Sequence, residues 1–421
     1  MVANGVASEA APAAALQAAD VPAVVHKALG GIVEERGWEK PKFHIEIGSQ
    51  EGDGYLSVLY RVVAENEADG DDLRLMCKTM LGALDGSLFL AHVFKAESLM
   101  YNKVLPAMEE IANMKKPLPW PRGYPNELQP PCLVMEDLRP EGFSICKRGT
   151  VLDDQHARLF VTEMARFHGA GMALDKLRPD FIAEFVREST NLAVMEELKE
   201  KFAVFTNSGR EAPLMIKDRF PEGSPVFENL KTRFESFGTD FFGYIVPDPD
   251  GGNAIVHGDA HINNVMFQRD ESGAPCGCRL IDFQAVRYGW PTPDLLTNLL
   301  CVTEKPTRDK HFREWLKLYH ETLQDTLCAA GIKDPDSVYS WDRFQGHLSR
   351  AAKMVVCMVP MLVFGFTEDE AIKEIQGALA TMATNEEDQP PPDYQFKLKE
   401  TPTLKRRFGD VVDDLVEWGW L

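Results

Sequence analysis

The stretch between Ile255 and Asp282 constrains the fold of this chain more than any other part of its sequence. Apolar residues at both ends of 255–267 predict two short strands that flank a polar loop. A further apolar run at 280–281 leads directly into Asp282. The polar side chains thus gather at strand ends, which predicts a site built from loops.

Asp259, Asn264 and Asp282 carry groups that phosphoryl transfer to a hydroxyl requires. That reaction needs an acceptor for the hydroxyl proton, oxygen ligands for magnesium and a cation for the nucleotide phosphates. Asp259 followed five positions later by Asn264 matches a kinase catalytic loop, and Asp282 before Phe283 matches the metal-binding Asp of the next loop. Taken alone, either short motif is also compatible with a capped turn.

The N-terminal region has the pattern of a small antiparallel sheet. Alternation over 43–47 breaks at Gly52-Asp53-Gly54 and resumes over 56–62, which predicts a hairpin. The run 73–78 predicts a third strand. On that strand Lys78 lies on the face opposite to its apolar residues.

Glu97 lies on the apolar face of a helix predicted from Ser87 to Val104. A carboxylate buried there alone is costly, so a cation from a neighbouring element is expected, and Lys78 is the nearest candidate. Lys78, Glu97 and the later polar groups follow the chain order of kinase machinery. This order favours a catalytic interpretation of the loops.

Proline-rich residues 117–131, and the apolar strand that follows them, predict a lobe boundary. We expect residues 1–22 to be a flexible lead, 23–135 an N-lobe that binds nucleotide, and 136–421 a C-lobe that carries the catalytic loop and acceptor pocket.

The C-lobe pattern is mainly helical. Asp153 or Asp154 is expected to cap a helix ending near His168-Gly169, and Thr292 to cap another that begins at Pro293. Asp294 is then an orienting or capping acid. The last helix, which includes Phe408, is expected to dock through one apolar face.

Composition excludes several classes of protein. The net charge of −20 disfavours nucleic-acid and anionic-membrane partners. The first two dozen residues lack the basic start of a signal peptide. Met354–Phe366 is too short to span a bilayer, so it predicts a buried helix. Cysteines without framework spacing point to a reducing compartment, and the cytoplasm is expected.

The chain resembles the ecdysteroid-kinase-like family, relatives of the choline and aminoglycoside kinases, over roughly residues 30–421. The resemblance implies an α+β, two-lobed protein-kinase-like fold, with a small antiparallel-sheet N-lobe and a larger, mostly helical C-lobe. The matching pieces are 55–62, Cys77-Lys78-Thr79, 94–97 with Tyr101 and Leu105-Pro106, 257–267, and Asp282-Phe283-Gln284 with Arg287, Tyr288, Pro291 and Asp294.

The resemblance also implies ATP and Mg²⁺ as cofactors, with Asp259 as catalytic base. Asn264 and Asp282 would hold magnesium, and Lys78, positioned by Glu97, would contact the nucleotide phosphates.

Adenine is expected near Glu136 to Leu138, although these residues also fit a plain linker. The Gly52–Gly54 turn lacks the full glycine-rich loop of protein kinases, so backbone amides near Gly54 to Ser57 are expected to cradle phosphate. His261 stands where the family often has Trp, and it either alters the acceptor pocket or is structural. As lone histidines, both His261 and His257 fit a structural hydrogen-bonding role better than a catalytic one.

The resemblance suggests a small-molecule alcohol as acceptor, such as an ecdysteroid or a hydroxylated xenobiotic. A choline- or aminoglycoside-type acceptor stays open, as does a catalytically silent nucleotide-binding pseudokinase. A protein kinase is disfavoured because no Ala-Pro-Glu element follows Asp282, and no P-loop motif occurs. The sequence leaves the oligomeric state open.

Overall fold

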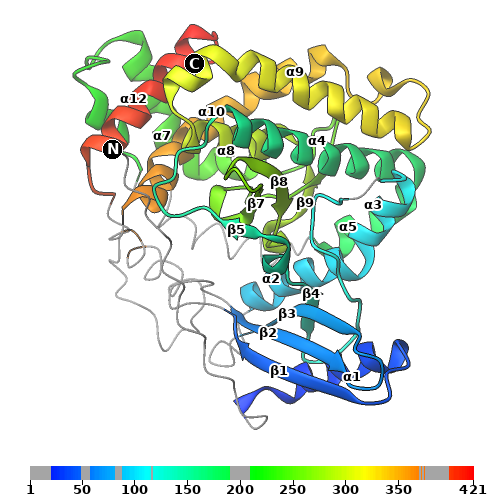
Figure 1. Cartoon of the computed structure of the whole chain (residues 1–421). Coiled ribbons are helices and arrows are strands. Elements are labelled where there is room, and N and C mark those ends of the chain that lie inside the picture. The colour runs from blue at the N-terminus through cyan, green and yellow to red at the C-terminus, as the bar shows by residue number, and fades with distance from the viewer. Residues whose placement is uncertain are drawn as a thin grey trace. The chain divides into compact units, whose positions relative to one another are not determined.

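The computed structural model describes residues 20–48, 57–80, 88–114, 117–189, 209–368, 371, 374 and 398–421. The chain divides into two compact units (Figure 1). The first combines Met1–Leu81 with Gly123–Asp137, and the second combines Gly82–Arg122 with Leu138–Leu421. The predicted lead lies almost wholly outside the described residues.

The first unit contains a four-stranded antiparallel sheet in the order β1-β2-β3-β4. Its first two strands pair as the predicted hairpin, with a turn that lies outside the described residues. β3 covers the predicted third strand, and β4 reaches the sheet after the excursion through the second unit. The strands are β1 (Pro41–Ile47), β2 (Ser57–Asn66), β3 (Asp72–Met80) and β4 (Cys132–Glu136).

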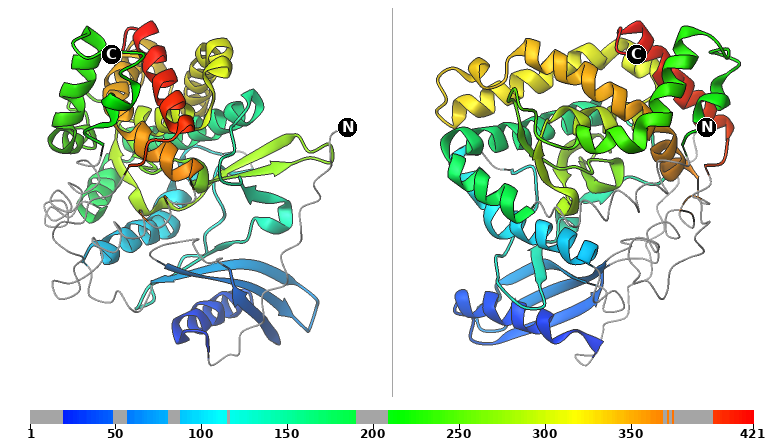
Figure 2. Two further views of the ribbon diagram at one scale, coloured as in Figure 1. Left: turned by 90° about the vertical axis from the view of Figure 1, so that its left-hand side faces the viewer. Right: turned by 180° about the vertical axis from the view of Figure 1, so that it is seen from behind.

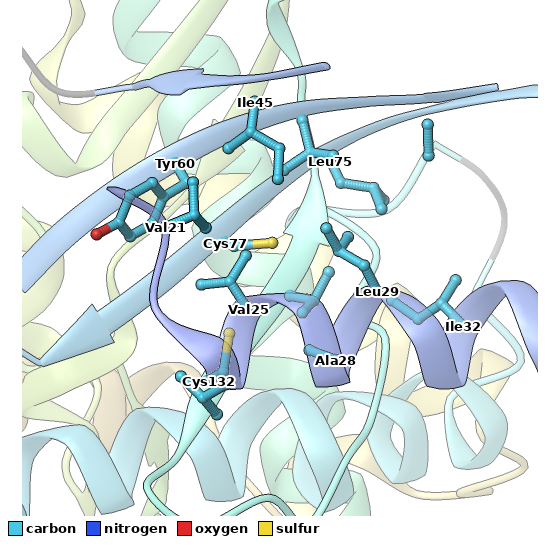
Figure 3. Packing of buried hydrophobic residues seen from close by; sticks show 14 residues of the cluster. Val21, Val25, Ala28, Leu29, Ile32, Ile45, Tyr60, Leu75, Cys77 and Cys132 are labelled. Carbon is cyan, nitrogen blue, oxygen red and sulfur yellow. The ribbon is translucent and has the colours of Figure 1, made fainter. Parts of the chain in front are cut away.

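Helix α1 (Ala23–Glu35) covers one face of this sheet and forms the core of the first unit (Figure 3). Leu29 on the helix and Leu75 and Cys77 on β3 are fully buried in one cluster. Each large aliphatic side chain buried in this way contributes roughly 1.5–3 kcal/mol. Lys78 follows Cys77 on the strand and therefore lies on the opposite face, as predicted.

The segment Gly82–Arg122 belongs by its contacts to the second unit, which differs from the predicted N-lobe of 23–135. Its helices run consecutively as α2 (Leu88–Leu99), the π-helix η3 (Met100–Val104) and α3 (Leu105–Ile111). The reason is side-chain packing, since Tyr101 is buried and its ring contacts Phe283 of the second unit.

The second unit is mostly helical, with two small antiparallel sheets, β5-β7-β8 and β6-β9. The fold is therefore α+β, with a small antiparallel-sheet unit and a larger helical one, as expected for a two-lobed protein-kinase-like chain. Its main elements are α4 (Asp154–Leu177), α5 (Pro179–Ser189), α7 (Pro225–Tyr244), α8 (Thr292–Val302), α9 (Lys305–Ala329), α10 (Trp341–Thr367) and α12 (Pro402–Glu417), with β5 (Phe143–Ile145), β6 (Ala254–Val256), β7 (Val265–Arg269), β8 (Pro275–Leu280) and β9 (Arg287–Gly289).

Helix α4 is the central helix of this unit and packs against α9, β6 and β8. Asp153 caps it as predicted, by accepting a hydrogen bond from the His156 amide at 3.0 Å. The predicted end near His168-Gly169 is wrong, because the helix continues to Leu177. A Cβ on Gly169 would lie 2.9 Å from Thr326, and one on Gly171 would lie 2.8 Å from the Ile255 amide nitrogen. Here glycine permits close packing instead of ending the helix.

The predicted cap at Thr292 is also wrong. Thr292 is the first residue of α8, and its hydroxyl donates to the carbonyl of His347 at 3.1 Å instead of capping the helix. Residue Asp294 falls in the first turn and points its carboxylate at a loop, as described below.

Helix α10 includes the predicted buried helix Met354–Phe366 and is largely buried. By length and composition, the helical stretch Pro335–Thr367 could cross a membrane, but 67% of its most apolar window is buried, as in a core helix. Helix α12 lies beside α10 (Figure 2), and its Phe408 and Leu415 are fully buried. The C-terminal helix therefore docks through its apolar face, as predicted.

Candidate active site

The polar loop 257–264 connects β6 to β7, which belong to different sheets. Gly258 has a φ of +82°, and a Cβ at this position would overlap the carbonyl of Ala285. Only glycine fits both the backbone conformation and the close approach. The loop is therefore held directly against the segment that follows Asp282.

Asp294 anchors the start of this loop from helix α8. Its carboxylate accepts hydrogen bonds from the amides of His257 at 2.7 Å and Gly258 at 3.0 Å, and from His168 at 3.1 Å. The other ring nitrogen of His168 lies 2.7 Å from the Tyr319 hydroxyl. A buried carboxylate with three donors is well compensated. The contacts match the orienting acid predicted from the sequence.

Electrostatics agree with this arrangement. Burial tends to raise the pKa of Asp294, but hydrogen bonding to His168 and the charges of Arg287 and His257 bring that pKa below its ordinary value. Burial lowers the pKa of His168, against the effect of Asp294. Asp294 is thus an anion that accepts hydrogen bonds from neutral His168 and two backbone amides, which replace the water molecules of an exposed carboxylate.

Asp259 and Asn264 are in direct contact at the end of the loop. The Asn264 side-chain nitrogen donates to the Asp259 carbonyl at 2.9 Å and to its Oδ2 at 3.2 Å. With the nitrogen used in this way, the amide presents its oxygen to any further ligand. The Asp259 side chain remains 35% exposed, so a substrate can reach it.

His261 contacts the other carboxylate oxygen of Asp259, with Nε2 3.4 Å from Oδ1. Burial tends to raise the pKa of Asp259, but the charges of His261 and His257 and the hydrogen bonds of His261 and Asn264 lower it to about 2. Burial tends to lower the pKa of His261, which Asp259 and Asp282 nevertheless raise. Asp259 is therefore ionised at neutral pH.

The backbone around Asp282 ties it to the same loop. The Ile281 amide donates to the carbonyl of Asn264 at 3.0 Å, and the His257 ring donates to the carbonyl of Ile281 at 2.9 Å. Asp282 itself has a φ of +66°, a left-handed conformation shared by only one other non-glycine residue, Asn113, in the described part of the chain. Such conformations persist only where the surroundings enforce them, and they cluster at functional sites.

Helix α2, which carries Glu97, packs against the turn Phe283–Ala285 that follows Asp282, and aromatic rings lie beside this contact. The rings of His257 and Phe283 are 4.9 Å apart, and those of Phe283 and Tyr101 are 5.8 Å apart. Burial, with the charges of Glu97 and Asp282, raises the pKa of Tyr101 well above its ordinary value. The second unit therefore brings Asp259 and Asn264 against the residue before Asp282, and it packs the helix that carries Glu97 against the turn after Asp282.

Asn264 and Asp282 suit a hard divalent cation, because each offers an oxygen ligand of the kind that magnesium prefers. A second acidic group, Asp309 with Asp414 and Glu417, lies at the junction of α9 and α12. Lys305 already pairs with this group, since its Nζ lies 3.0, 2.6 and 3.1 Å from the three carboxylates. We assign that group to packing of the C-terminal helix.

The remaining predicted site residues, apart from Leu138, lie in the first unit. Lys78 is buried and lies opposite Leu59 of β2 and Leu133 of β4 in the sheet register. Ser57 is the first residue of β2, and Glu136 is the last residue of β4. Leu138 begins the second stretch of the second unit and packs against Phe143 and Met266. Gly54 lies outside the described residues. The Lys78–Glu97 pair and the adenine and phosphate contacts stay predictions.

Sequence reasoning missed the roles of His168 and Arg287. His168 was placed at a helix end, although a polar residue next to Phe167 within an apolar helix pattern signals a buried partner. The backbone of Arg287 pairs with that of Val256 across β6 and β9. Burial lowers the pKa of Arg287 below its ordinary value, although the charges of Asp294 and Asp259 oppose this shift. Both residues lie behind the loop that carries Asp259.

A choline kinase from Cryptosporidium parvum Iowa II is similar at 12% identity over 94% of this chain and 98% of that one, with a TM-score of 0.43. A Plasmodium vivax ethanolamine kinase is similar at 11% identity over 81% and 82%, with a TM-score of 0.39. No curated protein matches the chain. The model of the ecdysteroid kinase-like family matches residues 51–332, which include both predicted loops, and the chain therefore belongs to that family.

Proposed function

We propose that this chain is a small-molecule kinase that transfers the γ-phosphoryl group of ATP to a hydroxyl, with Mg²⁺. One observation carries the proposal. The side-chain nitrogen of Asn264 donates a hydrogen bond to the Asp259 carboxylate, and its backbone carbonyl accepts one from the amide of Ile281, the residue before Asp282. A proton acceptor and two oxygen ligands are thereby tied into one loop cluster. Membership of the ecdysteroid kinase-like family supports the same conclusion.

In the proposed reaction, the acceptor hydroxyl donates a hydrogen bond to Asp259. Its oxygen forms a bond to the γ-phosphorus, the bond from that phosphorus to the β,γ-bridging oxygen breaks, and ADP leaves. Asp259 takes the hydroxyl proton. Because its pKa is about 2, Asp259 is a weak base, so it acts mainly by orienting the hydroxyl and accepts the proton late in the transfer.

Asn264 and Asp282 would hold the magnesium ion, which neutralises charge on the nucleotide phosphates when bound. Lys78, positioned by Glu97, is proposed to contact the phosphates from the first unit. Amides near Gly54 to Ser57 and the backbone of Glu136 to Leu138 are proposed for phosphate and adenine, respectively. These contacts follow from the family resemblance and from the chemistry that each residue offers.

The acceptor is proposed to be an ecdysteroid or a hydroxylated xenobiotic, with other small alcohols as the alternative. A silent pseudokinase is less consistent with the chain, because Lys78, Glu97, Asp259, Asn264 and Asp282 are all present. A cytoplasmic location is proposed as well, and all eight cysteines are free, as a reducing compartment would keep them.

Purified protein tests the proposal with ATP and MgCl₂ in the presence of ecdysteroids, choline-like amines, aminoglycosides and hydroxylated toxins. We expect ADP release that depends on one class of acceptor, together with a product whose mass has increased by one phosphoryl group. No ADP release with any acceptor, while ATP still binds, would instead support the silent scaffold.

A further inference from the structure

We propose that His261 is a positioning residue that fixes the Asp259 carboxylate for the acceptor hydroxyl, and that Phe366 holds the His261 ring in place. The inference deepens the proposed function and rests on the role of Asp259 in it. The sequence is compatible with either a structural or a functional role for His261, and the contacts of the side chain decide between them.

The two oxygens of the Asp259 carboxylate have different neighbours. Oδ2 accepts from the Asn264 side chain at 3.2 Å, and Oδ1 lies 3.4 Å from Nε2 of His261. Asn264 alone would leave the carboxylate free to tilt about that single contact. The imidazole limits this motion on the side of Oδ1, which is the oxygen that Asn264 leaves for the acceptor hydroxyl.

The backbone places His261 at the centre of this turn. Its amide donates to the carbonyl of Asp259 at 2.8 Å, and its carbonyl accepts from the amide of Asn264 at 2.9 Å. The separation of 259, 261 and 264 is therefore fixed by main-chain hydrogen bonds. A side chain at 261 that can donate toward Oδ1 starts from a defined position instead of searching for one.

Phe366, in the last turn of α10, packs against the His261 ring. The ring centroids of His261 and Phe366 are 5.3 Å apart with an interplanar angle of 57°, and Phe366 is buried. The end of α10 is itself anchored, since the Gly149 amide donates to the Phe366 carbonyl at 2.8 Å, and Arg148 donates to the carbonyls of Gly365 and Glu368. The ring therefore packs on a fixed element.

The polar contacts of His261 differ from those of a structural histidine in the same unit. Both ring nitrogens of His168 are bonded, one to Asp294 and one to Tyr319. Nδ1 of His261 is buried without a hydrogen-bond partner among the described residues, so the side chain directs its one polar contact at Asp259. A histidine that served packing alone would not need that contact.

Three variants test the inference. His261→Phe keeps a ring against Phe366 but removes Nε2, His261→Gln keeps a donor but removes the ring, and Phe366→Leu weakens the support. His44→Phe, at an exposed position on β1, is the matched control. For each variant kcat and KM are measured with Mg-ATP and the acceptor found in the screen, and with water as acceptor if none is found, alongside thermal unfolding.

We expect His261→Phe to lower kcat by about 10- to 100-fold, the range expected when a reacting group is displaced by about 1 Å, with KM for ATP within about twofold of wild type. His261→Gln should recover part of that loss. Phe366→Leu should lower kcat less, and combining it with His261→Phe should add little, because both changes act through one ring.

An unchanged kcat in His261→Phe would overturn the inference while leaving the proposed function intact. So would a loss that His261→Gln does not relieve, or one that tracks a lower unfolding temperature, since either indicates packing alone. If the wild-type protein does not turn over ATP with any acceptor or with water, the proposed function fails, and the inference fails with it.

Discussion

The core of the first unit and the loop that carries Asp259 are both buried against a helix, but by opposite chemistry. In the first unit, α1 and β3 share apolar residues such as Leu29 and Leu75. In the second, Asp294 of α8 bonds the loop directly and His168 of α4 bonds Asp294, and both side chains are buried but polar. The first region is stabilised by apolar surface removed from water, and the second by a small number of directed hydrogen bonds.

This difference predicts how each region fails. Apolar packing is roughly proportional to the area removed from water, so its loss is graded and mainly affects stability. When a buried carboxylate or one of its hydrogen-bond partners is removed, the groups that remain are buried without a partner, which is costly. Damage at Asp294 should therefore affect stability and the geometry of Asp259 together, whereas damage in the first core should leave the loop intact.

The largest effect is expected from Asp259→Asn, which should lower kcat by about 10³-fold, because the amide cannot accept the hydroxyl proton. ATP affinity and the unfolding temperature should change little, since the Asp259 side chain is partly exposed and contacts Asn264 and His261 of its own loop. Coupled ADP assays and nucleotide titration measure both. Near-normal turnover would contradict the assigned role of Asp259.

Asp294→Asn should lower the free energy of unfolding by about 3–5 kcal/mol, as expected when one partner of a buried charged network is removed. It should also lower kcat, because an NH2 group replaces one of the two carboxylate oxygens that accept from the amides of His257 and Gly258. Denaturant unfolding and turnover are measured together, with exposed Asp336→Asn as control. A stability loss with full kcat would separate the anchor from the site and break the comparison.

Leu29→Ala should lower the free energy of unfolding by about 2–5 kcal/mol through the cavity it leaves in the first core. Leu29→Met nearly conserves volume and should cost less than about 1.5 kcal/mol. At temperatures where the variant is folded, kcat should match wild type. A large drop in kcat under those conditions would show that the apolar core also sets the chemistry.

Asp282→Ala should weaken nucleotide binding about tenfold, or about 1.4 kcal/mol, with magnesium present and much less without it. The reason is the loss of one oxygen ligand for the metal, which then cannot bridge to the phosphates. Calorimetric titration with and without MgCl₂ gives the difference. If wild type and Asp282→Ala bind nucleotide equally well, with and without MgCl₂, Asp282 is not part of the site.

The smallest effect is expected from Asp153→Ala, which removes the cap of α4 and should cost about 1 kcal/mol of stability. Asp153→Ser keeps a capping oxygen and should recover most of that loss. Turnover should be unaffected, because the cap lies at the opposite end of α4 from Gly169 and Gly171. A change in kcat would mean that α4 transmits strain to the loop.

Local pattern was enough for several elements of the fold. The hairpin of β1 and β2, the strand that carries Lys78, the cap at Asp153 and the docked last helix follow from periodicity and side-chain chemistry within a few residues. Helix α1 was missed even though its apolar residues repeat with helical spacing. The predicted end of α4 was wrong because Gly169 and Gly171 allow close packing against α9 and β6. Those elements are distant in sequence, so the local pattern does not show them.

By itself, the sequence determined the chemical inventory: an acid and an amide five residues apart, a second acid at a strand end, and the family to which they belong. Only the tertiary structure decided that Asp294 and His168 anchor the loop, that Gly82–Arg122 joins the second unit, and that Phe366 supports His261. The physical reason is distance along the chain. Hydrogen bonds and ring contacts act over a few ångströms in space, and residues 261 and 366 become neighbours only when helix and loop pack together.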